Sequence, residues 1–244
     1  MYKNPGSCRG FLFKLIPLTM KNVIITGAGK GIGFALANKF LEEGHRVIAI
    51  SRNIEALKKI KPDHGELHAV SADITNTTQV VENILAIITS VDVLVNNAGA
   101  FLKKPFEQIS IQEMEMVYKT NVFAPLKLIG ELKKHFVSGA HIVNIGSMGG
   151  VPGAMKFPGL SVYSSSKGAL GILTECLQTE LKEQNVAINC LAIGAVSTEM
   201  QQKAFPDYVP EVNSKQMAQY IFSYAIHANA VQMGQMVPLT KTNP

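Results

Sequence analysis

Ser147, Tyr163 and Lys167 carry a hydroxyl, a phenol and an ammonium group that could act together on one carbonyl. Tyr163 and Lys167 are four residues apart, which on a helix places them one turn apart on the same face. A free phenol has a pKa of about 10, so it exchanges protons poorly at neutral pH unless a nearby charge stabilises its phenolate. Lys167 is placed to supply that charge, and Ser147 to hold a substrate oxygen. The residue types therefore indicate general acid and base catalysis.

The elements that must position these residues alternate along the chain. Short strands rich in Val and Ile are expected at 21–27, 46–50, 66–70, 91–95, 141–145, 186–190 and 235–239. Helical patterns are expected at 34–44, 54–60, 76–89, 110–136, 163–183 and 214–228. This alternation predicts an α/β fold with a doubly wound parallel sheet of about seven strands, covered by helices on both faces. Such sheets bind ligands at the carboxyl ends of their strands.

Composition favours one compact enzyme-sized domain. The 244 residues are 47% hydrophobic and 17% charged, and we expect residues 20–244 to form a single domain. No apolar run is long enough to predict a membrane-spanning helix. The net charge is +5, but three basic residues precede Met20 and leave +2 for the rest of the chain. This excess is too small to indicate nucleic-acid binding.

Residues 1–19 are expected to be an N-terminal extension, either disordered or preceding a true start at Met20. A signal peptide is the alternative, but the apolar patch is interrupted by Lys14 and Pro17 and lacks a small-residue cleavage site. The cysteines, Cys8, Cys176 and Cys190, have no metal-like spacing, which suits reduced thiols in a cytoplasmic protein.

His64 and His68 have the spacing of a helical metal pair. Pro62 and Gly65 argue against a helix there, so no metal site is predicted.

A glycine-rich loop, TGAGKGIG at 26–33, lies between the first strand and the first helix. Gly27 is placed for a tight turn, Gly31 for close approach of a pyrophosphate to the backbone, and Gly33 for close packing of the helix on the sheet. The spacing is G-x-x-x-G-x-G rather than the commoner G-x-G-x-x-G.

Six motifs in register make the chain resemble a classical short-chain dehydrogenase/reductase. They are TGAGKGIG at 26–33, ADI at 72–74, NNAG at 96–99, TN at 120–121, IGS at 145–147 and YSSSK at 163–167. The resemblance covers residues 21 to about 200 and implies a Rossmann-type fold.

The resemblance implies a role for each catalytic residue. Tyr163 would be the acid and base, and Ser147 would hold and polarise the substrate oxygen. Lys167 would lower the pKa of the phenol and bind the nicotinamide ribose. Asn121 would anchor a water that links Lys167 to solvent, or would instead serve only a structural hydrogen bond in a helix kink.

The resemblance also implies a cofactor site. Asn96 would tie strands together and, with Ala98 and Gly99, line the cofactor, while Asp73 and the backbone of Ile74 would meet the adenine. The expected cofactor-binding residues are Gly27, Lys30, Gly31, Ile32, Gly33, Ser51, Arg52, Asp73, Ile74, Asn97, Ala98, Gly99, Tyr163, Lys167, Gly194, Val196 and Thr198. No metal is required, because hydride transfer is the chemistry of the cofactor.

The residues after the second strand indicate which cofactor is preferred. NAD-preferring relatives would carry an acidic residue there, whereas this chain has Ser51 and Arg52. Arg52 and Lys30 could bracket a 2′-phosphate, unless Arg52 simply points to solvent. We therefore predict NADP(H) as the preferred cofactor, with NAD(H) possible. The chain resembles NADPH-dependent carbonyl reductases, which indicates that the physiological direction is reduction of a carbonyl.

The chain departs from the family pattern at several points. The interval from Ser147 to Tyr163 is longer than usual, so Met148, Met155 and Phe157 form either an unusual apolar pocket wall or a surface loop. Ile193 and Gly194 replace the usual Pro-Gly pair after the sixth strand. The expected substrate lid at 199–211 is short. The ending QMVPLTKTNP lacks the usual glycines, so the sequence does not decide whether the last strand forms.

Two functions follow from the sequence. The first is an NADP(H)-dependent reductase of a ketone, aldehyde or 3-oxoacyl compound, and the second is a dinucleotide-binding sensor or scaffold without catalysis. A sensor would be expected to lose Ser147, Tyr163 or Lys167, and the chain keeps all three. The expected partners are a small carbonyl or alcohol substrate and further copies of the chain in a homodimer or homotetramer, with neither nucleic acid nor membrane.

Overall fold

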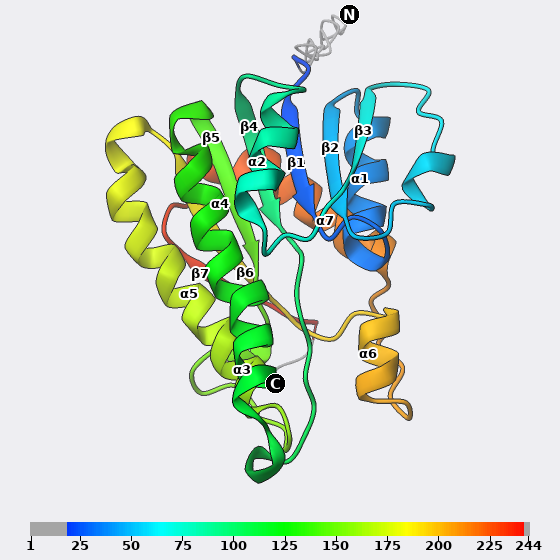
Figure 1. The fold of residues 1–244 in the computed structure, drawn as a ribbon, viewed down its shortest axis with the longest axis vertical. Coiled ribbons are helices and arrows are strands. Elements are labelled where there is room, and N and C mark those ends of the chain that lie inside the picture. Colours follow the sequence, from blue (N-terminus) through cyan, green and yellow to red (C-terminus); the bar gives the residue numbers. More distant parts are fainter. Residues whose placement is uncertain (1–18, 242–244) are drawn as a thin grey trace, which may run out of the picture.

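The computed structural model describes residues 19–241, which form one twisted parallel sheet between two layers of helices (Figure 1). The expected extension at 1–19 therefore lies almost entirely outside the described residues. The strands are β1 (Asn22–Thr26), β2 (Arg46–Ser51), β3 (Glu66–Ser71), β4 (Val91–Asn96), β5 (Phe136–Ile145), β6 (Ala187–Ile193) and β7 (Met236–Leu239). The helices are α1 (Gly31–Glu42), α2 (Thr77–Leu85), α3 (Ile111–Tyr118), α4 (Ala124–Leu132), α5 (Ser161–Leu181), α6 (Glu199–Ala204) and α7 (Ser214–His227).

The strand order is β3-β2-β1-β4-β5-β6-β7, and every neighbouring pair is parallel. The order reverses between β1 and β4, which opens a crevice at the carboxyl ends of these two strands. The predicted doubly wound, seven-stranded Rossmann-type sheet is confirmed. The last strand, which the sequence left open, pairs with β6, and its Pro238 is tolerated because β7 is an edge strand.

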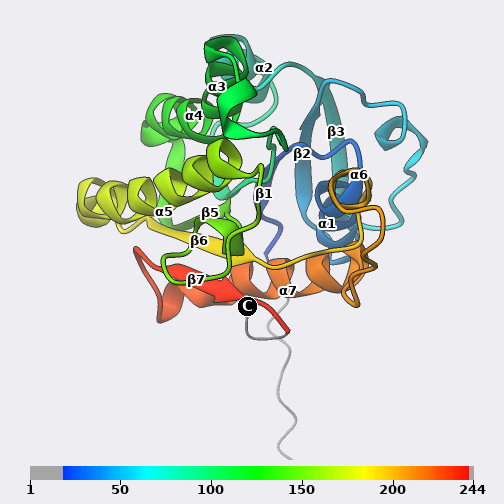
Figure 2. The ribbon, with the colours of Figure 1, turned by 90° about the horizontal axis from the view of Figure 1, so that it is seen from below.

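Two apolar cores fill the space on either side of the sheet. Alternation along β1 sends Val23 and Ile25 to the face covered by α1 and α7, and Ile24 to the face covered by α2, α4 and α5. Figure 2 shows the two helical layers above and below the sheet. Burial on both faces explains why the strands read as continuous apolar runs.

Two predicted helices differ in the structure. The segment 54–60 forms only a 3₁₀ turn at Leu57–Lys59, because it is short and Pro62 disfavours helical backbone in the residue before it. The long stretch predicted at 110–136 divides into α3, a π-helical turn at Lys119–Phe123, and α4. Pro125 lacks the N–H that would bond the Asn121 carbonyl in a regular α-helix, which gives a physical reason for the widened turn.

The fifth strand is longer than predicted. Helix α4 ends at Leu132, a 3₁₀ turn follows at Lys133–His135, and β5 begins at Phe136 rather than at residue 141. The added residues are irregular, since the pairing of β4 with β5 shifts register between Val91 and Val93 and Gly139 has a φ of +83°. A sequence pattern based on apolar strands does not include such a segment.

Candidate active site

The predicted site residues gather at the carboxyl edge of the sheet, the end seen in Figure 2. Ser147 follows β5, the NNAG segment ends β4, and the glycine loop joins β1 to α1. Tyr163 and Lys167 lie in the first two turns of α5. The parallel sheet brings these separate segments to one place because all its strands end on the same side.

Ser147, Tyr163 and Lys167 form one cluster. The hydroxyl of Ser147 lies beside the phenol of Tyr163, close enough to lower the pKa of the phenol. Ser147 also accepts a bond from the backbone N–H of Gly149 at 3.2 Å, which fixes its rotamer. The Nζ atom of Lys167 lies 6.0 Å from the centroid of the Tyr163 ring and donates to the Ile145 carbonyl oxygen at 2.7 Å. The trio predicted from spacing therefore converges in space.

Burial acts in opposite directions on the two titratable groups. It lowers the pKa of Lys167 to about 8, with the nearby Cys190 acting weakly against this shift. Burial raises the pKa of Tyr163, and the hydroxyl of Ser147 only partly offsets that rise. The direction for Tyr163 corrects the lowered phenol pKa expected from the sequence, because desolvation dominates here. At neutral pH the tyrosine is protonated and the lysine is mostly charged.

Asn121 is completely buried and connects the cluster to the loop after β4. Its Oδ1 accepts from the N–H of Ala100 at 2.7 Å, and its Nδ2 donates to the Ala100 carbonyl at 2.9 Å. The same Nδ2 lies 2.9 Å from Oγ of Ser166, which donates to the carbonyl of Tyr163 at 2.7 Å. Asn121 thus has a structural bonding role, and it stands in the π-helical turn, a feature frequent at functional sites.

Three glycines of the loop stand where a side chain would be strained or would clash. Gly27 and Gly31 have φ values of +67° and +59°, which favour glycine. A Cβ on Gly33 would lie 2.4 Å from the Gly27 carbonyl oxygen and 2.5 Å from Nδ2 of Asn97. Asn97 itself donates to the Thr26 and Gly27 carbonyls at 2.9 and 3.1 Å. The loop is held against the end of β4 by these contacts.

The first turn of α1 fits the pyrophosphate of a dinucleotide. Its N-cap residue, Lys30, makes no side-chain capping bond, and the turn contains no acidic residue. The N–H groups there remain available to an anion, and the helix dipole favours negative charge. A Cβ on Gly31 would be in ordinary van der Waals contact with Thr198 Cγ2 at 3.7 Å, so the positive φ and not crowding favours glycine at this position.

The residues predicted to contact the adenosine half lie at the ends of β2 and β3. Ser51 ends β2, and Arg52, which is exposed, follows it. Asp73 accepts from the N–H and hydroxyl of Thr75 at 2.9 and 2.8 Å, and these bonds, with a smaller effect of Arg52, hold its pKa below the usual range. Ile74, partly buried, follows Asp73. Lys30 forms an ion pair with Glu199 at 2.5 Å.

The other predicted cofactor residues lie after β4, after β6 and in the first turn of α1. A Cβ on Gly99 would meet Asn121 Oδ1 and Lys167 Nζ, each at 3.6 Å. Thr198 caps α6 by accepting from the N–H of Gln201 at 3.2 Å. Ala98 donates its N–H to Thr26 Oγ1 at 3.0 Å, and Gly194 donates its N–H to Leu239. Ile32 lies in the first turn of α1, and Val196 is buried before α6.

Sequence reasoning missed four residues of this region. A Cβ on Gly29 would lie 2.4 Å from Ser51 Oγ, and this glycine stands in the motif itself, where it could have been recognised. Thr26 Oγ1 accepts from the N–H groups of Asn97 and Ala98 at 3.1 and 3.0 Å. Ser166 and Phe101 carried no signal, since their roles depend on contacts between distant segments.

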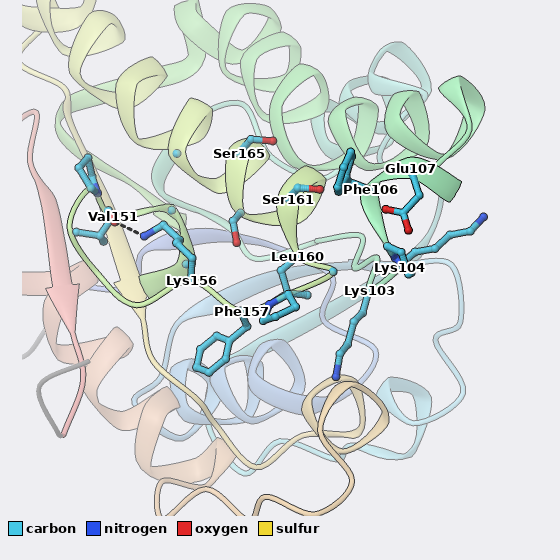
Figure 3. A pocket seen from close by; sticks show the side chains of 18 residues that line it. Lys103, Lys104, Phe106, Glu107, Val151, Lys156, Phe157, Leu160, Ser161 and Ser165 are labelled. Atoms are coloured by element: carbon cyan, nitrogen blue, oxygen red, sulfur yellow. Dashed lines mark hydrogen bonds between the residues drawn. The ribbon is translucent and has the colours of Figure 1, made fainter.

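Two cavities adjoin the cluster. The larger, of about 960 Å³, lies between the 103–107 segment, the 149–161 loop and the start of α5, and catalytic side chains do not line it (Figure 3). The smaller, of about 410 Å³, is lined by Met148 and by Gly194 and Ala195. Both cavities include chain neighbours of the catalytic residues: Ser164 and Gly168 line the larger, and Met148 lines the smaller.

The family model for short chain dehydrogenases matches residues 21–209. This chain belongs to that family. It is similar to a probable tetrahydroxynaphthalene reductase from Zymoseptoria tritici, with 28% identity over 78% of this chain and 73% of the relative. Short-chain dehydrogenases bind NAD(P) and transfer hydride between it and an alcohol or carbonyl, so this protein is an NAD(P)-dependent oxidoreductase.

Solved structures agree with this assignment. A putative NAD(P)-dependent gluconate 5-dehydrogenase from Beutenbergia cavernae, with bound NADP, has a TM-score of 0.78 and 29% identity over 91% of this chain and 95% of its own. A 3-ketoacyl-(acyl-carrier-protein) reductase from Brucella melitensis, complexed with NADH, has a TM-score of 0.79 and 25% identity over 89% and 96%. The two structures hold different dinucleotides.

Two other kinds of site are absent from residues 19–241. No group of three or more His, Cys, Asp or Glu side chains in this part of the chain could hold a metal ion. Among the same residues, no helix combines the length and apolar character needed to cross a bilayer.

Proposed function

We propose that this protein is an NADP(H)-dependent reductase that converts a carbonyl compound to an alcohol. The observation that carries the proposal is the convergence of Ser147 and Tyr163 beside the buried ammonium of Lys167. The bound nicotinamide supplies the hydride to the carbonyl carbon. A phenol whose pKa is raised by burial remains protonated at neutral pH, which suits a proton donor and favours reduction.

The proposed roles of the side chains follow from this geometry. Ser147 binds and polarises the carbonyl oxygen, and Tyr163 gives its proton to the alkoxide that forms there. The charge of Lys167 stabilises the phenolate left behind. Asn121 lies in the widened turn of the α3–α4 segment and is proposed to hold the water that returns a proton from solvent. The single-domain organisation of residues 20–244 is part of the same proposal.

A sensor or scaffold without catalysis is the alternative function. One measurement distinguishes the two functions. The purified protein is mixed with NADPH and a panel of ketones, aldehydes and 3-oxoacyl compounds, and the loss of nicotinamide absorbance is recorded. Substrate-dependent oxidation of NADPH supports the reductase. Binding of NADPH without oxidation by any compound on the panel contradicts it and supports the sensor.

Preference for NADP(H) rests on Arg52, because the predicted partner Lys30 is paired with Glu199. Arg52→Asp replaces a guanidinium that suits a 2′-phosphate by a carboxylate that suits a 2′-hydroxyl. We expect the ratio of kcat/KM for NADPH to that for NADH to fall by about a hundredfold, since roughly two charge-assisted bonds are lost. Lys59→Asp, the same charge change at an exposed residue outside the predicted cofactor site, is the matched control. An unchanged ratio in Arg52→Asp contradicts the cofactor assignment.

The oligomer is proposed to form through α3, α4 and α5. These helices expose the large apolar side chains Ile111, Met116, Phe123, Leu126 and Ile172, a row that a second copy would cover. Light scattering should give the mass of a homodimer or homotetramer, and the mass of one chain would contradict the pairing. Cytoplasmic residence is also proposed, in keeping with the free thiols of Cys176 and Cys190.

A further inference from the structure

Three loops at the carboxyl edge are tied together by the side chains of Lys103, Phe205 and Phe157. Nζ of Lys103 donates to the carbonyl of Ala204 at 2.7 Å and lies 4.2 Å from the centroid of the Phe205 ring. The Phe205 ring packs edge-on against Phe157, with centroids 5.6 Å apart. We call these three side chains the bridge. They connect the loops that follow β4, β5 and β6.

Further contacts hold the same three loops. The N–H of Lys104 donates to the Gly159 carbonyl at 2.9 Å and joins the first loop to the second. At the other end of α6, Glu199 pairs with Lys30 of the glycine loop. That pair is exposed and contributes little by itself, whereas Lys103 combines a hydrogen bond with a cation–π contact. Side-chain contacts therefore hold both ends of the short helix α6, and the contacts of Lys103 are the stronger ones.

The first loop also reaches the catalytic cluster. The ring of Phe101, two residues before Lys103, lies 4.9 Å from the ring of Tyr163, centroid to centroid. Figure 3 shows Lys103 extending from this loop toward the α6 segment and Lys104 extending in another direction. The loop that carries Lys103 of the bridge thus also places the aromatic ring of Phe101 beside the proposed proton donor, Tyr163.

A cavity beside the bridge has a largely apolar and partly aromatic lining. Phe157 borders the smaller cavity of about 410 Å³, together with Met148 and Tyr208. This volume lies within the range of about 300–1,000 Å³ that is typical of small-molecule sites. Aromatic rings bind flat π-systems in offset or edge-on arrangements, which a saturated chain or ring cannot match.

We propose that the bridge closes α6 over the active site and that Phe101, with the aromatic surface behind it, selects a ketone whose carbonyl is attached to a flat aromatic ring. The selection rests on the proposed reductase function, whereas the closure of α6 does not. Lys103 and Phe205 are positioning residues in this scheme, and Phe101 is a residue that determines specificity.

The closure is tested by limited proteolysis with trypsin, which needs no catalytic activity. Lys203 is exposed, but the next residue, Ala204, is buried, so cleavage between them requires α6 to open. Lys103→Met keeps the length of the side chain and removes both contacts. We expect cleavage after Lys203, followed by mass spectrometry, to become about tenfold faster in Lys103→Met and in Phe205→Leu.

The matched control for the closure is Lys104→Met, which removes the neighbouring lysine, whose side chain pairs with Glu113 of α3 and not with α6. It should be cleaved after Lys203 at the wild-type rate. Equal cleavage rates in Lys103→Met, Phe205→Leu and Lys104→Met would overturn the closure.

The selection is tested by NADPH oxidation with 1-tetralone, a flat aryl ketone, and cyclohexanone, a saturated one. The wild-type kcat/KM should be at least about tenfold higher for 1-tetralone, and Phe101→Leu should lower the ratio of kcat/KM for 1-tetralone to that for cyclohexanone by about tenfold. Preference for cyclohexanone, or equal losses for both ketones, would overturn the selection. Inactivity toward every carbonyl compound would instead refute the reductase function, and proteolysis would still decide the closure.

Discussion

At the scale of single residues, the site depends on how burial changes the protonation of two neighbouring side chains. It raises the pKa of the Tyr163 phenol and lowers that of the Lys167 ammonium to about 8. Both groups are protonated at neutral pH, although desolvation brings the lysine close to losing its charge. In the proposed reaction Tyr163 is the proton donor, and the charge of Lys167 that would activate it titrates within the pH range of an ordinary assay.

The pH dependence of reduction follows from the Lys167 pKa. As pH rises through about 8, Lys167 loses the charge that stabilises the phenolate, while Tyr163 keeps its proton to a higher pH. We expect kcat/KM for the carbonyl substrate, measured with NADPH at saturation, to be constant below this pH and to decrease about tenfold per unit above it. A profile that stays flat to pH 10 would show that the charge of Lys167 does not control the proton donor.

The residue types at the site could be predicted because their chemistry is visible in their spacing, as with Tyr163 and Lys167 or the glycines of the first loop. Phe101 and Lys103 could not be predicted in this way. Their partners, Tyr163 and Phe205, lie far along the chain, and only packing of the loops brings these side chains together. The rise in the pKa of Tyr163 could not be predicted from the sequence either, because desolvation depends on what surrounds the phenol in the folded protein.

At the scale of elements, the π-helical turn at Lys119–Phe123 connects the loop after β4 with α5. It turns Asn121 inward, where the amide binds both backbone groups of Ala100 and the hydroxyl of Ser166. The sequence pattern predicted one continuous helix here because apolar spacing is nearly the same on both sides of the turn. Pro125, near the start of α4, was the available sign of an interruption.

Asn121→Leu should destabilise the protein measurably. A leucine of similar size leaves the buried N–H and carbonyl of Ala100 without their partner, at a cost of about 2–4 kcal/mol in the free energy of unfolding. Urea denaturation measures this value. Thr120→Val, which removes a hydroxyl that bonds back to Met116 in its own helix, is the control and should cost less than about 1 kcal/mol. Equal losses in the two variants would contradict the structural role of the amide.

At the scale of the whole molecule, the sequence predicted the alternation of strands and helices and the presence of an apolar core on each face of the sheet. Apolar strands such as β1 and β4 could be found because both faces are buried. The buried polar groups that link layers were not predicted. His141 on β5 bonds the Ala225 carbonyl of α7 through Nδ1 at 3.0 Å, and Asn189 of β6 through Nε2 at 2.9 Å. Since Asn189 Nδ2 donates, His141 is held neutral, with its proton on Nδ1.

The neutral His141 predicts a loss of stability in acid. Burial lowers its pKa to about 4, so the unfolded chain binds a proton between pH 6.5 and about 4 that the folded protein does not bind. Stability from this group is complete above pH 6.5 and falls with pH through that window, by about 3 kcal/mol in all. The free energy of unfolding, measured by urea at several pH values, should therefore depend less on pH in His141→Gln than in the wild type.

The control for His141 is His227→Gln, which changes an exposed histidine at the end of α7. Its pH dependence should match that of the wild type. The same slope in His141→Gln, His227→Gln and the wild type would show that His141 is not held neutral by the fold.

The most direct test of the central claim is Tyr163→Phe, which removes the phenol oxygen beside Ser147 and keeps the ring that packs on Phe101. Single-turnover oxidation of NADPH by a carbonyl substrate should slow by about a hundredfold or more, and the NADPH dissociation constant should change by less than about threefold. Tyr118→Phe, which removes a phenol bonded to Ser165, should react at the wild-type rate. Retention of more than about one tenth of the wild-type rate in Tyr163→Phe would contradict its role as proton donor.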